Sequence, residues 1–221
     1  MKTGRVAIII LGPPGAGKGT QARMISEALN FPHISTGDML REALRSETEL
    51  GRKAKGFMET GALVPDELVD AIVAERLTRE DCSRGFILDG YPRTIPQARF
   101  LQSLFDKNGT RILSIGVEVG ANVLINRLSS RWTCPKCGKM FNAGMSPDKM
   151  GGQCDACNTA LVQRKDDTAE EVIAERLQVY HTATRPLVRH YQEQGSYIDV
   201  DGDRPVDEVF GAIMKIIAKD E

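Results

Sequence analysis

The chain has 221 residues, of which 41% are hydrophobic and 27% are charged, and its formal net charge is −1. This length can bury one sizeable apolar core, and the near-zero charge argues against general attraction to nucleic acid or a membrane surface. No apolar run approaches a membrane span, and the first run, Val6–Leu11, is too short for a typical signal peptide. We therefore predict a cytoplasmic protein without a membrane partner.

Short apolar runs alternate along the chain with longer segments of helical periodicity. The predicted buried strands are Val6–Leu11, His33–Ser35, Phe86–Leu88, Ile112–Val119 and Tyr197–Val200. The predicted helices are Gly19–Leu29, Asp66–Glu80, Ile95–Asp106, Ala121–Leu128 and Val206–Ala218. This alternation predicts an α/β fold in which helices cover both faces of a parallel sheet.

Two stretches interrupt this alternation and are interpreted as insertions. Residues 36–63 are typical of short helices separated by glycines, whereas residues 131–164 are poor in aliphatic side chains and rich in Cys, Gly, Lys and Asn. After them, Thr168-Ala169-Glu170-Glu171 is a capping-box pattern that predicts a long helix, which Pro186 should kink or restart. The predicted division is a core of residues 1–34, 65–129 and 168–221, with insertions at 35–64 and 130–167.

The first predicted strand leads directly into a glycine-rich loop, Gly12–Thr20, which a predicted helix follows. Glycines let the backbone turn its N–H groups around phosphate oxygens, the helix N-terminus adds partial positive charge, and Lys18 supplies a full charge. The pattern predicts a P-loop for a nucleoside triphosphate. Gly19 stands where this motif usually has a hydroxyl group, so we expect phosphates and water to hold Mg²⁺, with Asp89 behind them. The predicted loop contacts are Gly15, Ala16, Gly17, Lys18, Gly19 and Thr20.

Four cysteines form two Cys-x-x-Cys pairs, Cys134 with Cys137 and Cys154 with Cys157, and sixteen residues separate the pairs. This spacing is typical of a tetrahedral structural zinc site. In a reducing compartment it favours metal over free or disulfide-linked cysteines, which are the weaker alternative. Because four thiolates leave zinc no open position, we predict one zinc ion per chain that folds the insertion without taking part in chemistry.

Four segments together resemble the adenylate kinase family: Gly12–Thr20, Ser35–Arg41, Leu88–Thr94 and Arg164–Asp167. They follow that family's order and spacing, and the similarity covers essentially the whole chain. The resemblance implies a P-loop nucleoside monophosphate kinase fold that reversibly transfers the terminal phosphoryl group of ATP to AMP, giving two ADP. It also implies Mg²⁺ on the nucleotide, and the cysteine insertion resembles the lid of the family's long, zinc-containing members. We expect a monomer, because one chain supplies a complete site.

The resemblance also assigns an acceptor site for AMP, and the insertion at 35–64 resembles the family's AMP-binding subdomain, which we call the acceptor subdomain. Thr36 and Gln97 would contact the adenine, Arg41 would hold the AMP phosphate, and Arg93 would bridge the two nucleotides' phosphates. Arginine suits these tasks because its planar fork grips two phosphate oxygens and keeps its charge. The other acceptor-site residues that the resemblance implies are Ala62, Leu63, Val64, Gly90, Tyr91, Pro92, Arg164 and Arg176.

The donor site is assigned in the same way. Arg131 would bind the ATP triphosphate, Arg127 would lie near its base, Met140 and Phe141 would touch the nucleotide, and Arg204 lies in a segment that contacts the donor adenine. Met140 departs from the family, which usually has a hydroxyl-bearing residue there. The catalytic groups would be Lys18, Arg93, Arg131, Arg164 and Arg176, with Asp89 orienting Mg²⁺. No covalent intermediate or general base is expected, because the attacking phosphate is already an oxyanion.

Two other functions stay open. One is a kinase for UMP, CMP or GMP, or an AMP kinase that uses GTP, although Thr36 with Gln97 resembles an adenine-selecting pair. The other is a zinc-ribbon module that binds nucleic acid, since residues 127–164 contain six basic and two acidic residues. The neutral chain disfavours the second alternative, so the predicted partners are ATP, AMP and ADP, without nucleic acid.

Overall fold

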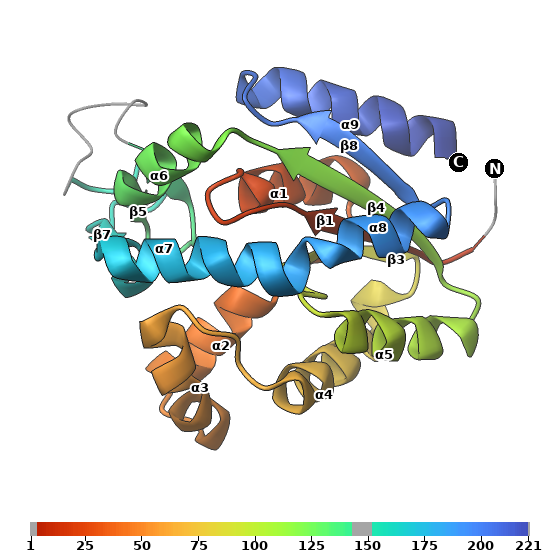
Figure 1. The fold of residues 1–221 in the computed structure, drawn as a ribbon, viewed down its shortest axis with the longest axis horizontal. Coiled ribbons are helices and arrows are strands. Elements are labelled where there is room, and N and C mark those ends of the chain that lie inside the picture. Colours follow the sequence, from red (N-terminus) through yellow and green to blue (C-terminus); the bar gives the residue numbers. More distant parts are fainter. Residues whose placement is uncertain (1–3, 143–151, 221) are drawn as a thin grey trace.

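The computed structural model describes residues 4–142 and 152–220, and a five-stranded sheet with strand order β2-β3-β1-β4-β8 lies at its centre (Figure 1). Every neighbouring pair of these strands is parallel, and helices make the crossovers between them. The predicted parallel α/β fold is therefore confirmed. The strands are β1 (Val6–Leu11), β2 (His33–Ser35), β3 (Gly85–Asp89), β4 (Arg111–Glu118) and β8 (Tyr197–Asp201).

The apolar side chains of β1 point alternately to the two faces of the sheet, so this central strand contributes to two cores. Ile8 and Ile10 join the cluster on the side of α1, α6 and α9, whereas Ile9 joins the cluster on the side of α4, α5 and α8. Figure 1 shows α9 on one side of the sheet and α4 and α5 on the other. These helices are α1 (Lys18–Leu29), α4 (Asp66–Leu77), α5 (Ile95–Asp106), α6 (Ala121–Ser129), α8 (Pro186–Glu193) and α9 (Val206–Asp220).

Helix α4 is shorter than the predicted helix Asp66–Glu80. It ends at Leu77, and a separate 3₁₀ turn, Glu80–Cys82, follows. The Arg5 guanidinium donates hydrogen bonds to the carbonyl oxygens of Leu77 (2.7 Å) and Cys82 (2.8 Å). These bonds satisfy backbone acceptors at the end of the helix and in the turn. The correction thus rests on a contact between residues far apart in sequence, which helical periodicity does not report.

A long helical run, α7 to α8, passes from the small sheet to the central one in Figure 1. Helix α7 (Glu170–Val179) begins after Ala169, not after the predicted cap Thr168, because a 3₁₀ turn over Lys165–Asp167 takes Thr168 as its own C-cap. A π-helical turn, Tyr180–Thr184, then leads into α8. Pro186 is the first residue of α8, where its missing N–H is not needed, and the predicted restart is confirmed.

The two predicted insertions have different structures. Residues 36–60 form two helices, α2 (Thr36–Arg45) and α3 (Glu49–Thr60). The cysteine-rich stretch forms a second, antiparallel sheet of order β6-β5-β7, made of β5 (Arg131–Thr133), β6 (Met140–Asn142) and β7 (Val162–Gln163). Residues 143–151 of the predicted lid lie outside the described residues, and the predicted domain boundaries stay a prediction.

Within residues 4–142 and 152–220, no helix combines the length and the apolar character that crossing a lipid bilayer requires.

Candidate active site

A large cavity lies at the carboxyl ends of three central strands. Strand β1 leads into the glycine loop, β2 into α2, and β3 into the turn at Gly90. Ligands of parallel α/β sheets bind at this edge. The sequence-predicted residues that line the cavity are Gly15, Gly17, Lys18, Gly19, Thr20, Thr36, Arg41, Ala62, Leu63, Val64, Asp89, Gly90, Arg93, Gln97, Arg127, Arg131, Met140, Arg164 and Arg176.

Five other predicted site residues do not line this cavity: Ala16, Tyr91, Pro92, Phe141 and Arg204. Pro92 lines a smaller neighbouring cavity, which shares Lys18, Gly90 and Arg93 with the first. The Tyr91 hydroxyl is turned inward and donates a hydrogen bond to Asp70 (2.6 Å). Phe141 is buried in the small sheet's own apolar cluster. Arg204 is exposed and pairs with Asp201 (3.1 Å). Their assignment to nucleotide contacts stays a prediction.

The glycine loop curls around the start of α1. Gly12, Gly15 and Gly17 have φ angles of 142°, 85° and 93°, a left-handed region that suits glycine. The Lys18 ammonium donates hydrogen bonds to the carbonyl oxygens of Gly12 (2.7 Å) and Pro13 (2.8 Å). Removal from water lowers the pKa of Lys18 to about 8, with Asp89 opposing and the cavity arginines reinforcing the shift.

Gly19 and Asp89 lie next to each other in the wall of the cavity. A Cβ atom on Gly19 would lie 3.1 Å from Asp89 Oδ2 and 3.0 Å from Met140 Cε, so a larger residue would crowd both groups. His33 Nε2 lies 3.3 Å from the same carboxylate oxygen. Burial would raise the pKa of Asp89, but the His33 hydrogen bond and the charges of His33, Lys18 and Arg93 outweigh it and lower the pKa. The site therefore holds an ionised carboxylate beside the loop, as a Mg²⁺ site requires.

On the predicted acceptor side, arginines surround Asp38. Arg41 donates a hydrogen bond to the Asp38 carboxylate (2.6 Å), and the Arg164 guanidinium lies 3.9 Å from it. The Arg164 Nε atom is buried without a hydrogen-bond partner among the described residues. Arg93 Nε and the Thr36 hydroxyl both donate to the Gly90 carbonyl oxygen, each at 2.8 Å. These cations form a concentration of positive charge suited to phosphate groups.

Asp167 joins two of the predicted catalytic arginines. Arg131 grips its carboxylate with two hydrogen bonds of 2.7 Å, and Arg176 makes an ion pair with the same group. Arg176 also donates to the backbone carbonyl of Asp166 (2.7 Å) and lies 3.0 Å from its carboxylate. The Asp167 side chain is fully buried, so its contacts with Arg131 on β5 and Arg176 on α7 hold the small sheet and α7 in a defined relation.

Arg127 lies beside the segment at 201–204, as the predicted donor-base subsite requires. Two of its guanidinium nitrogens donate to the Gly202 carbonyl oxygen, both at 3.1 Å. The structure thus brings together two predicted donor-site elements that 75 residues separate, although Arg204 itself points away.

Four ionisable residues line the cavity that the sequence analysis did not assign: Arg23, His33, Asp38 and Asp166. Asp38 and Asp166 stand inside the motifs Ser35–Arg41 and Arg164–Asp167, where the neighbouring arginines are a usable signal. His33 needs the sheet register, which pairs it with Ile87, two residues before Asp89. No sequence signal identifies Arg23.

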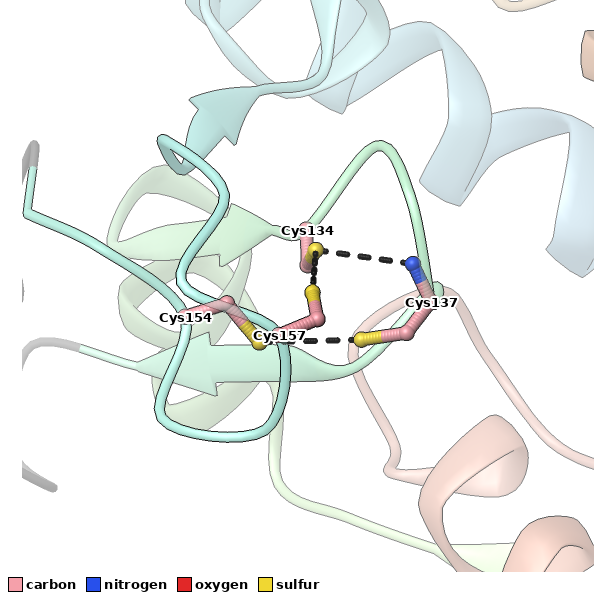
Figure 2. A group of neighbouring side chains, drawn as sticks. All are labelled: Cys134, Cys137, Cys154 and Cys157. Carbon is pink, nitrogen blue, oxygen red and sulfur yellow. Dashed lines mark hydrogen bonds between the residues drawn. The ribbon is translucent and has the colours of Figure 1, made fainter.

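The four predicted zinc ligands form one cluster, as Figure 2 shows. All four Sγ atoms lie within 4.8 Å of one another, with Cys134 and Cys157 at 3.3 Å and Cys137 and Cys154 at 3.6 Å. Tetrahedral zinc with bonds of about 2.3 Å places its sulfur ligands roughly 3.8 Å apart. The donor set and its dimensions therefore fit zinc.

The two cysteine pairs have the same backbone structure. The residue after each pair donates its N–H to the carbonyl of the first cysteine, Gly138 to Cys134 (2.9 Å) and Asn158 to Cys154 (2.8 Å). Gly138 and Asn158 both have positive φ, 71° and 56°. This repeated turn points both thiols of a pair to one side, which a shared metal ion requires. We call Cys134–Gly138 the first knuckle.

The first knuckle contacts both other parts of the predicted division. Arg45 on α2 donates a hydrogen bond to the Pro135 carbonyl (3.0 Å), and Arg23 on α1 donates to the Gly138 carbonyl (2.8 Å). Neither arginine is a predicted site residue. The small sheet is therefore closed over the cavity in this structure.

Comparison with known proteins agrees with this geometry. The family model described as adenylate kinase matches residues 10–196. The adenylate kinase of Caldanaerobacter subterraneus subsp. tengcongensis is 46% identical over 96% of both chains. Those of Agathobacter rectalis and Lachnospira eligens are 47% and 48% identical, over 96% and 95% of this chain and 99% of each relative. The chain therefore belongs to the adenylate kinase family.

Proposed function

We propose that this protein transfers the terminal phosphoryl group of ATP reversibly to AMP, forms two ADP, and so balances the adenine nucleotides. One observation carries the proposal: a single cavity joins a P-loop to a second, apolar slot, with a ring of cations between them. Two nucleotides can therefore meet with their phosphates at the centre. The relatives' name, adenylate kinase, supports the same reaction.

The donor triphosphate fits the glycine loop. Backbone N–H groups of this loop and the N-terminus of α1 would hold its phosphates, and Lys18 would exchange its carbonyl partners for phosphate oxygens. Arg127 and the segment 201–204 would contact the donor base. Asp89 would orient Mg²⁺ through water, because Gly19 offers no hydroxyl ligand.

The acceptor AMP fits the opposite end of the cavity. Its base would lie among Leu63, Val64 and Met58, beside Gln97, and its phosphate would meet Arg41, Arg93 and Arg164. The buried Nε of Arg164, which has no hydrogen-bond partner in the part of the chain that the structure describes, is a donor that a phosphate oxygen would satisfy.

Catalysis in this arrangement consists of positioning and charge stabilisation. The arginines and Lys18 would surround the moving phosphoryl group, where negative charge spreads in the transition state. An AMP phosphate oxygen is already a nucleophile, so no side chain needs to remove a proton. Water competes for the phosphoryl group, and closure of the small sheet over the cavity would exclude it.

The four cysteines would hold one structural zinc ion per chain, and the residues at 130–167 would act as a lid. None of the four cysteines lines the cavity, and their four thiolates would complete a tetrahedral shell. We also propose that the protein acts as a monomer, since one chain supplies all the residues assigned to both nucleotides.

A direct test is ADP formation from ATP and AMP by Lys18→Ala and Arg93→Ala variants. Each should lose at least about a hundredfold in kcat/KM, because each removes a charge from the transition state. Arg189→Ala is the matched control, since Arg189 is exposed on α8 and its ion-pair partner among the described residues is Glu193 (2.8 Å). Near-normal turnover by Lys18→Ala or Arg93→Ala, with native melting curves, would contradict the proposal.

The nucleotide preference needs a second assay. We expect transfer to AMP to exceed transfer to UMP, CMP and GMP, with ATP as the better donor than GTP. A preference for another monophosphate would show that the proposed acceptor is wrong, while the proposed role of the P-loop in binding the donor would stand.

A further inference from the structure

Gln97 is held from both sides of its amide group. Its Nε2 donates a hydrogen bond to Asp66 Oδ1 (2.9 Å), and its Oε1 accepts one from the Arg93 backbone N–H (2.7 Å). The residue is only 3% exposed, yet it lines the cavity. Asp66 comes from the first turn of α4 and Gln97 from the first turn of α5, so two helix starts meet at this amide.

A further hydrogen bond holds Asp66 in place. Its second oxygen, Oδ2, accepts from the Thr94 hydroxyl (2.7 Å), and the Thr94 oxygen in turn accepts from the Gln97 backbone N–H (3.2 Å). Thr94 is the N-cap of α5, so the end of the helix and the carboxylate are tied together. Both Asp66 oxygens are thus engaged by groups that can only donate to them.

These partners leave the Gln97 amide one orientation. The Arg93 backbone N–H can only donate a hydrogen bond, and an ionised carboxylate such as that of Asp66 can only accept one. The oxygen of the Gln97 amide therefore faces Arg93, and its NH₂ group faces Asp66. Turning the amide over would place Nε2 against the Arg93 N–H and Oε1 against the Asp66 carboxylate, with two buried hydrogen bonds lost. One Nε2–H and one Oε1 lone pair are left for a ligand in the cavity.

The Thr36 hydroxyl also has a fixed hydrogen-bond direction. Its buried hydroxyl donates to the Gly90 carbonyl oxygen (2.8 Å), which leaves only the acceptor side of that oxygen for a ligand. The cavity therefore offers two acceptors, Gln97 Oε1 and Thr36 Oγ1, and one donor, Gln97 Nε2. Adenine complements this set, because its 6-amino group donates and the adjacent ring nitrogen accepts. A 6-oxo purine presents an acceptor where adenine donates.

We propose that Asp66 is a specificity-determining residue that acts through Gln97, by fixing the amide in the orientation that reads a 6-amino purine and rejects a 6-oxo purine. This inference rests on the proposed function, in which the AMP base lies beside Gln97. Asp66 itself does not line the cavity, so it is a positioning residue. Rejection is strong in such a site, because the wrong base leaves buried polar groups unpaired.

The test compares AMP with inosine monophosphate, which differs from AMP only in having a 6-oxo group and a ring N–H. In Asp66→Asn, the new amide can turn either end toward Gln97, so only the Arg93 N–H still opposes turning the Gln97 amide over, and one of the two penalties is removed. We expect the AMP-to-IMP ratio of kcat/KM to fall at least about tenfold, with the KM for ATP unchanged. The ratio is insensitive to a loss of folded protein, because both substrates use the same enzyme sample.

Two variants serve as controls. Glu67→Gln removes the same charge from the adjacent, exposed position in the first turn of α4, and its ratio should stay within about twofold of the parent protein. Asp66→Glu keeps an acceptor-only group and should retain most of the discrimination, even where the longer side chain lowers kcat/KM for AMP.

Gln97→Ala separates failure of this inference from failure of the base assignment. If Gln97→Ala raises the KM for AMP and collapses the ratio while Asp66→Asn keeps it, Gln97 reads the base without help from Asp66 and the inference is overturned. If Gln97→Ala changes neither the KM for AMP nor the AMP-to-IMP ratio of kcat/KM, the AMP base does not lie beside Gln97. Both the placement of the base and the inference about Asp66 would then be wrong. Failure of phosphoryl transfer in the parent protein would instead refute the proposed function.

Discussion

Lys18 keeps its ammonium group on the loop's own carbonyl oxygens, and this single residue links the cavity to pH. Removal from water lowers the pKa of Lys18 to about 8. The group is therefore charged below that pH and neutral above it, whereas a lysine on the surface stays charged to much higher pH. A neutral amine contributes little attraction to a triphosphate.

We accordingly expect the KM for ATP to rise above pH 8 and to approach about a tenfold increase per pH unit. Lys18→Arg should bind ATP more weakly but without this dependence, because a guanidinium keeps its charge throughout the range. The measurement is the KM for ATP from about pH 7 to 9.5 at saturating AMP. A flat profile for the parent protein would show that Lys18 stays charged in the free enzyme.

At the scale of elements, the small sheet depends on the cysteine cluster. Its strands β5, β6 and β7 have at most three residues each, and its buried apolar cluster consists of Cys134, Phe141, Cys154 and Leu161. Such a core is too small to fold alone, so the free energy of metal binding would supply most of the stability. The central sheet has two large cores of its own.

Cys137→Ser should therefore reduce bound zinc from about one ion per chain to a small fraction, because a serine hydroxyl is a poor zinc ligand. Amide hydrogen exchange should accelerate in β5–β7 and stay slow in β1. Cys82→Ala is the control, since Cys82 is buried on the far side of the core and lies outside the cluster. Unchanged zinc content in Cys137→Ser would contradict a four-thiolate site.

The sequence predicts the central strands well and the lid poorly, for a physical reason. Val6–Leu11 is bounded by charge and glycine, and its strand has the predicted limits. Strands of two or three residues, such as β7, are too short to show a period of two. The end of α4 depends on Arg5, and the Asp66–Gln97 bond joins residues 31 apart, so neither could be found before the chain was folded.

The residues of the candidate site also divide into those that local sequence motifs predict and those that only the folded chain identifies. The spacing of the glycine loop predicts Lys18, whereas Arg41 is predicted from the resemblance of the motif Ser35–Arg41 to the adenylate kinase family. The structure brings both residues to one cavity. His33 was missed because its role depends on strand register, and Asp167 because its partners Arg131 and Arg176 come from separate elements.

At the scale of the whole molecule, the first knuckle connects the parts that surround the cavity. Its two carbonyl groups, those of Pro135 and Gly138, accept from Arg45 on α2 and Arg23 on α1. The metal-bound turn would thereby touch the acceptor subdomain and the core at once. Closure over the donor and closure over the acceptor would then favour each other.

Arg45→Gln should shift the lid toward the open state by about fivefold, the value of one such hydrogen bond. Single-molecule energy transfer between dyes at Lys55 and Lys136, attached without cysteine chemistry, would measure this shift. Arg52→Gln is the matched control, because the partner of Arg52 among residues 4–142 and 152–220 is the Glu47 carbonyl of the same insertion (2.6 Å). An unchanged closed population in Arg45→Gln would show that this contact does not contribute to closure.

The ion pairs inside the cavity have a consequence for turnover. Arg41, Arg131 and Arg176 already have carboxylate partners in the protein, Asp38 and Asp167. In the proposed function, nucleotide binding would then be a counter-ion exchange. Phosphate oxygens would displace the carboxylates, which would pair with the arginines again when the product leaves. The net gain per arginine would be the difference between two similar contacts, which would keep ADP from binding too tightly to dissociate. A reversible enzyme needs this balance in both directions.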